Sequence, residues 1–149
     1  MPATPDGPAL AFDLGTRWIG VAIGHPLGGN ARALKTIAAG DWTALDALIA
    51  DWQPRDLVVG LPLALDGSEQ PMSKRAREFA VALERRYTRA VHLADERGSS
   101  QEAARRFARR RAEGAARRKD ANDIDSLAAA VILDQWFANG GARPATESA

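Results

Sequence analysis

Apolar residues form two runs near the start of the chain, separated by a short polar turn. The first run, LAFDLG, covers residues 10–15, and the second, WIGVAIG, covers residues 18–24. Both have the length of a strand, and the Gly15–Thr16 pair between them is a turn signal. The pattern predicts two strands joined by a tight hairpin turn at Gly15–Thr16. A third strand is expected at residues 31–37, after the turn cluster HPLGGN.

Farther along the chain, the spacing of apolar residues alternates between helical and strand-like. Residues 41–52 have apolar side chains three and four positions apart, which predicts a helix with Asp41 as its N-cap. Residues 55–62 form a short continuous apolar run, typical of a buried parallel strand. The same patterns predict helices at 73–87, 100–113 and 125–141 and a strand at 89–96.

The predicted order of elements indicates the class of fold. Three strands in hairpin style come first, and the later strands alternate with helices. This order is typical of an α/β protein with a mixed sheet and helices on both faces. We expect five strands, of which the first three are antiparallel and the later ones parallel.

Length and composition limit the class of protein. A chain of 149 residues with 46% hydrophobic and 26% charged residues is expected to form one domain, with flexible tails at about 1–7 and 140–149. The absence of cysteine excludes disulfides and thiolate metal sites. No apolar run reaches the roughly 18 residues of a membrane span, and residues 1–9 lack a signal-peptide pattern. A cytoplasmic protein that binds no membrane is therefore expected.

Acidic residues interrupt the apolar pattern at the ends of two predicted strands. Asp13 lies inside the first apolar run, and strand alternation places it on the face opposite Phe12 and Leu14. Asp95 and Glu96 close the last predicted strand and must point to opposite faces, so only one of them can belong to a shared site. Ligands commonly bind at the C-terminal ends of strands in open α/β sheets, which makes these positions candidates.

The last predicted helix carries a third candidate acid. At about 100° per residue, Asp125 shares a face with Ile132 and Trp136, whereas Asp134 is expected to face solvent. Asp123 also lies off the apolar face and suits the N-terminal cap or first turn of the helix. Asp125 is therefore the acid of this helix that is expected to face the sheet.

Convergence of Asp13, Glu96 and Asp125 would create a repulsion that divalent cations relieve. Carboxylate oxygens suit Mg²⁺ or Mn²⁺, and two such ions about 3.5–4 Å apart can activate water and stabilise the leaving oxygen of a phosphodiester. Each acid also has a simpler interpretation. Asp13 could accept from backbone N–H groups of its turn, Glu96 could pair with arginines, and Asp125 could stabilise its own helix N-terminus. Periodicity alone leaves these alternatives open.

The cations of the chain are unevenly distributed, although its formal net charge is only +1. Eight of the twenty Lys and Arg residues fall between positions 105 and 119. A basic segment beside an acidic site would attract a polyanion, while a solvated helix face is the simpler interpretation. The candidates for nucleic-acid contact are Arg17, after the Gly-Thr turn, and Arg105, Arg106, Arg109, Arg110, Arg117, Arg118 and Lys119.

Four blocks of the sequence resemble the YqgF family, also called RuvX, of the RNase H-like superfamily. They are LAFDLGTRWIGVAIG, VVGLPLALDGSEQP followed by RAREFA, DER within HLADERGSSQEA, and IDSLAAAVILDQWF. The resemblance covers nearly all of residues 9–139. It implies an RNase H-like fold and a divalent-metal nuclease whose catalytic, metal-binding acids are Asp13, Glu96 and Asp125. Family members are described as nucleases of 5′-end maturation of pre-16S rRNA, and an older label is Holliday junction resolvase.

One position departs from the family pattern. After DER the family usually has Leu followed by two hydroxyl residues, whereas this chain has Gly98 followed by Ser99 and Ser100. Gly98 is expected to loosen the turn that leads from Glu96 into the basic segment. The effect of this glycine on activity stays open at this point.

The sequence therefore predicts a hydrolase that cleaves phosphodiesters of structured RNA with two Mg²⁺ or Mn²⁺ ions. The expected role is 5′-end maturation of pre-16S rRNA in ribosome biogenesis, carried out by a monomer that associates with the ribosome. The main alternative is a resolvase of branched DNA, which would need a dimer. A third possibility is an ATP-binding module, because Asp13–Thr16 resembles the phosphate loop of sugar kinases and actin. A fourth is a ribosome-associated protein that binds RNA without cleaving it.

Overall fold

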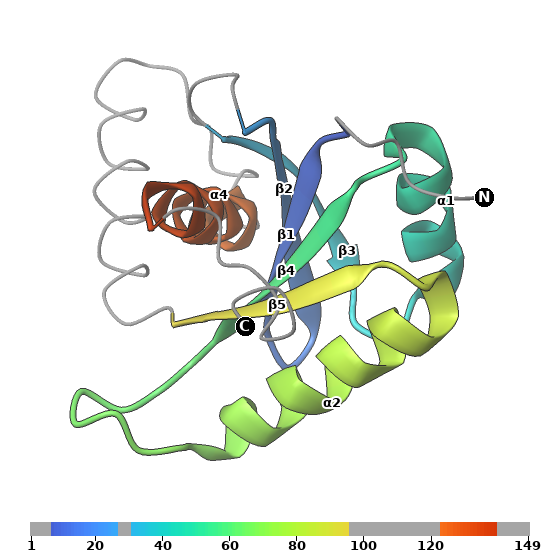
Figure 1. The fold of residues 1–149 in the computed structure, drawn as a ribbon. Coiled ribbons are helices and arrows are strands. Elements are labelled where there is room, and N and C mark those ends of the chain that lie inside the picture. Colours follow the sequence, from blue (N-terminus) through green and yellow to red (C-terminus); the bar gives the residue numbers. More distant parts are fainter. Residues whose placement is uncertain (1–6, 27–30, 96–122, 140–149) are drawn as a thin grey trace.

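The described part of the chain is a five-stranded mixed sheet with helices on both faces (Figure 1). The computed structural model describes residues 7–26, 31–95 and 123–139. The strands are β1 (Ala9–Leu14), β2 (Trp18–Gly24), β3 (Arg32–Ala38), β4 (Asp56–Leu61) and β5 (Ala90–Asp95). The helices are α1 (Trp42–Trp52), α2 (Pro71–Tyr87) and α4 (Asp123–Ala138). The helix expected at 100–113 lies outside the described residues.

The strand order is β3-β2-β1-β4-β5. The pairs β1–β2 and β2–β3 are antiparallel, and the pairs β1–β4 and β4–β5 are parallel. This arrangement confirms the predicted fold class. Within the described ranges, no helix has the length and apolar character needed to cross a membrane.

The turn between β1 and β2 differs from the tight two-residue turn that the sequence predicts. Three residues, Gly15 to Arg17, lie between the strands, and the Gly15 N–H donates to the Trp18 carbonyl at 2.8 Å. A Cβ on residue 15 would lie 2.9 Å from that carbonyl oxygen, so the close approach requires glycine. The longer turn sets the register, in which Asp13 is opposite Gly20.

Large apolar side chains cover the face of the sheet that α1 and α2 pack against. From β1 and β2 this core takes Leu10, Phe12, Ile19 and Val21, all at most 1% exposed. Phe12 meets Phe79 of α2 edge to face, with ring centroids 5.7 Å apart. The helices begin as local signals favour: Asp41 caps α1 by accepting from the Ala44 N–H at 3.0 Å, and α2 begins at a proline.

Small side chains cover the other face, where α4 lies (Figure 1). Strands β1 and β2 contribute Ala9, Ala11 and Ala22 to this core. The α4 side chains that meet them are Ala129, Ala130, Ile132, Leu133 and Trp136. Ile132 and Trp136 of the predicted face lie in this cluster, but α4 is buried on more than that face, because Leu127, Ala128 and Val131 form a second cluster with Ala33 of β3.

Candidate active site

Asp13 lies near the C-terminal end of β1, on the face that α4 covers. Phe12 and Leu14 pack into the core on the opposite face, whereas Ala9 and Ala11 pack toward α4. Since side chains alternate along a strand, Asp13 shares the face of Ala9 and Ala11. The residue is half-buried. The predicted orientation of this acid is therefore correct.

The neighbouring strands offer only small residues at the level of Asp13. Gly20 of β2 is directly opposite Asp13, and Thr36 of β3 is opposite Gly20. On the other side, the β1–β4 register pairs residue 12 with residue 59, so Gly60 is level with Asp13, and Gly60 pairs with Ala94 of β5. A carboxylate flanked by two glycines has no side chain beside it on either adjacent strand. Neither adjacent strand therefore places a side chain where a group bound to Asp13 would lie.

Sequence reasoning did not assign this row of small residues to the site. Gly20 would be found only with the correct turn length, because a two-residue turn pairs different positions across the hairpin. The level of Gly60 relative to Asp13 depends on the parallel pairing of β1 with β4. Neither relation can be read from local patterns.

Strand β5 ends at Asp95, the first of the two neighbouring acids that the sequence singles out. His92 and Ala94 contact the α4 side of the sheet, since the His92 ring lies 5.0 Å from the Trp136 ring and Ala94 packs in the α4 cluster. Asp95 is the next residue of the strand, so its Cβ is expected on the side opposite to that of Ala94, and the residue is exposed. Asp95 nevertheless lines a pocket together with Gln135, Ala138 and Asn139, at the C-terminal end of α4. Glu96 lies outside the described residues.

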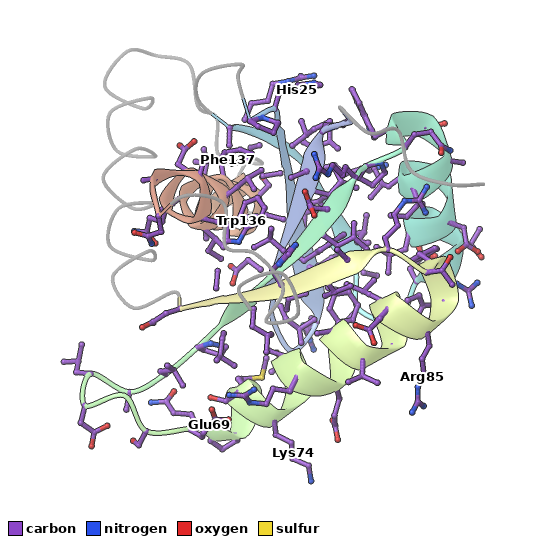
Figure 2. The ribbon with its side chains drawn as sticks, in the orientation of Figure 1. His25, Glu69, Lys74, Arg85, Trp136 and Phe137 are labelled. Carbon is purple, nitrogen blue, oxygen red and sulfur yellow. The ribbon has the colours of Figure 1, made fainter. Side chains whose placement is uncertain are left out.

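Asp125 lies in the first turn of α4, where the backbone is described and the side chain is not. The positions that share its predicted face, Ile132 and Trp136, are buried against the sheet, as Figure 2 shows for Trp136. Asp134 departs from the prediction that it faces solvent. Its Oδ1 atom accepts from the Ala31 N–H at 2.7 Å and the residue is partly buried, because α4 passes the start of β3 and the carboxylate completes the hydrogen bonding there.

Two of the three predicted metal ligands are thus not available as described side chains. Among the side chains that are described, no three acids or histidines gather to hold a metal ion. His92 is buried, and its Nε2 atom lies 3.1 Å from Asp56 Oδ1. The described part of the candidate site is therefore Asp13 and the small residues beside it.

One of the predicted nucleic-acid contacts is described. Arg17 is exposed on the β1–β2 turn, next to the strand end that carries Asp13, and its carbonyl accepts from the Ala39 N–H at 2.8 Å. Trp18 follows it and is 41% exposed. The other predicted contacts lie outside the described residues; they are Arg105, Arg106, Arg109, Arg110, Arg117, Arg118 and Lys119.

Comparisons with known proteins agree with this arrangement. The family described as "RuvX: Holliday junction resolvase" matches residues 7–139. A protein of Xanthomonas oryzae pv. oryzae named "Putative pre-16S rRNA nuclease" is 54% identical over 138 residues, which are 90% of this chain and 89% of that protein. A Xylella fastidiosa protein of the same name is 53% identical over 139 residues, or 91% and 90% of the two chains.

Solved structures extend the likeness to the fold. RuvC of Thermus thermophilus in complex with a Holliday junction substrate superposes with a TM-score of 0.56 at 15% identity, covering 93% of this chain and 99% of that one. At this identity the likeness concerns the fold, and it confirms the RNase H-like expectation. With the family matched over residues 7–139 and relatives above 50% identity along their length, this chain belongs to the RuvX family.

Proposed function

We propose that this protein is a metal-dependent nuclease that cleaves phosphodiesters of structured RNA, in the 5′-end maturation of pre-16S rRNA. The names of relatives that are more than 50% identical along nearly the whole chain support this activity. The structural observation that supports it best is the half-buried carboxylate of Asp13 between two glycines at the C-terminal edge of the sheet. Ligands commonly bind at this edge of α/β sheets.

The residues present fit a divalent cation. Asp13, Glu96 and Asp125 would hold it, because carboxylate oxygens are the ligands that Mg²⁺ and Mn²⁺ prefer. Gly20 and Gly60 leave room beside Asp13 for a cation and its waters. When bound, two such ions would activate a water molecule and stabilise charge on the phosphate. Two ions and this set of three ligands are part of the proposal.

The chain itself would bind and orient the RNA. Arg17 is placed at the Asp13 edge, where its guanidinium can pair with a phosphate beside the scissile bond. The basic segment of residues 105–119 adds cations that would attract RNA and make binding dependent on salt. We further propose that the protein acts as a cytoplasmic monomer in association with the ribosome.

Cleavage of branched DNA is the second candidate function. The family description names Holliday junction resolvase, and this observation favours it. A resolvase cuts two strands symmetrically and would act as a dimer. A sedimentation experiment that finds a monomer on branched DNA would argue for the RNA function.

The test is cleavage of a ribosome-bound precursor carrying the 5′ leader of 16S rRNA, with and without Mn²⁺. Asp13→Asn should lower the rate by about two orders of magnitude or more, because the carboxylate charge at the reacting phosphate is lost. Asp46→Asn is the matched control, since Asp46 is also a hydrogen-bonded carboxylate but lies where α1 and α2 meet, away from the proposed site. Cleavage by Asp13→Asn at the wild-type rate would refute the proposal.

A further inference from the structure

The connection between β4 and α2, residues 62–70, is tied at its tip. The Gly67 N–H donates to the Ala64 carbonyl at 2.8 Å, and the Ala64 N–H donates to the Ser68 carbonyl at 2.9 Å. Gly67 has a φ of +88°, which favours glycine at this position. The Asp66 carboxylate accepts from the N–H and the hydroxyl of Ser68 at 2.9 and 2.7 Å. The tip is therefore a hydrogen-bonded hairpin turn.

The base of the same connection is tied to α2. Residue 63 bridges residue 69, and Arg77 of α2 holds the Glu69 carboxylate with two hydrogen bonds of 3.1 and 2.7 Å. The buried Ser73 hydroxyl donates to the Pro62 carbonyl and accepts from the Gln70 N–H. The whole connection is thus braced against the first turns of α2.

This braced turn holds an apolar side chain in solvent. Leu65 occupies the first central position of the turn and is 91% exposed. Two other large hydrophobic side chains among the described residues are notably exposed, Val81 at 48% and Trp18 at 41%. The hydrogen bonds of the turn hold this leucine in place although its side chain is not buried in the fold, so the side chain is accessible to another molecule.

The position of the turn relative to Asp13 indicates which molecule. Strand β4 lies between β1, which carries Asp13, and β5, which ends one residue before Glu96. The connection begins at the C-terminal end of β4, and Figure 1 shows that it projects outward past the ends of these strands. A polynucleotide with one phosphate at the Asp13 edge would therefore pass beside Leu65.

The charges around the turn also suit a polynucleotide. The Arg77 guanidinium offsets the charge of Glu69, whereas the hydrogen bonds from Ser68 leave the negative charge of Asp66 in place. Lys74 and Arg75 are exposed on the first turns of α2, and Figure 2 shows Lys74 pointing outward near Glu69. These cations can pair with phosphates elsewhere along the same strand of RNA.

We infer that Leu65 contacts an unpaired base of the RNA next to the scissile phosphodiester. The inference rests on the proposed function and adds to it how the substrate is recognised: a flexible or unstacked nucleotide near the cleavage site. Apolar side chains such as leucine are inserted beside unstacked bases in other nucleic-acid complexes. A single side chain at a tip offers too small an area for a protein partner but enough for one base.

The test compares Leu65→Ala with Val81→Ala on precursor RNA free of ribosomes. Val81 is the matched control, because it is an exposed aliphatic side chain on α2 away from the strand ends. Leu65→Ala should lower kcat/KM about ten-fold, the effect of losing one base contact, while Val81→Ala leaves it unchanged. Leu65→Phe should restore cleavage, because its ring also packs against a base. Thermal unfolding should show that all three variants fold as the wild type does.

A binding measurement separates failure of this inference from failure of the proposed function. RNA with 2-aminopurine at an unpaired site should become more fluorescent with wild-type protein and with Val81→Ala, but not with Leu65→Ala. If Leu65→Ala matches the wild type in both fluorescence and cleavage, the inference about Leu65 is overturned. The proposed nuclease function is then still decided separately, by the cleavage rate of Asp13→Asn. A defect of Leu65→Ala that occurs only on ribosome-bound RNA would overturn it in favour of a contact with a ribosomal protein.

Discussion

The two faces of the sheet differ in the size of the side chains that they carry. On the face toward α1 and α2, strand β1 carries Leu10 and Phe12, both fully buried. On the face toward α4, the same strand carries Ala9, Ala11 and then Asp13. One strand of six residues thus builds a core on one side and a candidate site on the other.

This difference separates stability from function within single strands. Large apolar side chains remove much surface from water and stabilise the fold. Small residues bring α4 close to the sheet and leave room at the strand ends, where a carboxylate can bind other groups. Substitutions at adjacent positions of β1 should therefore have different consequences.

The largest expected effect is on the α1/α2 face. Phe12→Ala should lower the free energy of unfolding by about 3–5 kcal/mol, because it leaves a cavity and removes the edge-to-face contact with Phe79. Denaturant unfolding measures this change. Asp13→Asn, one residue farther, should leave most of the stability in place while it abolishes cleavage. Equal losses of stability in the two variants would break the distinction between the faces.

A smaller effect is expected on the α4 face, from Gly20→Ala. The added methyl group would lie beside the Asp13 carboxylate, so we expect cleavage to fall about ten-fold through misplacement of the groups that it binds. Because Gly20 is buried, the free energy of unfolding is measured alongside, and the loss of cleavage should exceed what any loss of folded protein explains. Unchanged cleavage would show that the row of small residues does not serve the site.

The smallest effect is expected at the surface where α1 and α2 meet. Asp46 accepts from Arg86 at 2.9 and 2.7 Å and from the Tyr87 hydroxyl at 2.7 Å. Hydrogen bonds from Arg86 and then Tyr87 lower the pKa of Asp46 from 3.8 to about 2. A carboxyl with a lowered pKa in the folded state adds stability above pH 3.8, which is lost as the pH falls through about 2.

Asp46→Asn should therefore flatten the dependence of stability on pH between about 4 and 2, with a small change at neutral pH because the group is exposed. Thermal unfolding across this range measures it. Cleavage should stay at the wild-type level, because the pair lies on the α1/α2 side of the sheet. If the stability of Asp46→Asn still falls steeply between about pH 4 and 2, other carboxyl groups cause the pH dependence.

Local patterns were sufficient for the elements and for the orientation of their faces. Alternation placed Asp13 opposite Phe12, and helical periodicity placed Ile132 and Trp136 against the sheet. The cap at Asp41 follows from the preference of aspartate for accepting from helix N–H groups. These relations extend over a few residues of the chain, so the sequence contains them directly.

Two features of the structure depend on contacts between distant segments. Asp134 was expected in solvent, but it accepts a hydrogen bond from Ala31, 103 residues earlier in the chain. The turn that carries the exposed Leu65 is braced by Ser73 and Arg77 of α2, through their bonds to Pro62 and Glu69. Neither partner can be identified from residue spacing.

The sequence by itself determined the α/β class and the orientation of β1. It also singled out Asp13, Glu96 and Asp125 as the candidate metal ligands, which the family resemblance implies as well. Short-range periodicity and local capping specify these properties, whatever the path of the chain in space. Only the tertiary structure decided that Gly20 and Gly60 flank Asp13 and that the Leu65 turn leaves the sheet beside it. Strand register and strand order decide such neighbours, because pairing joins residues that are far apart in the chain.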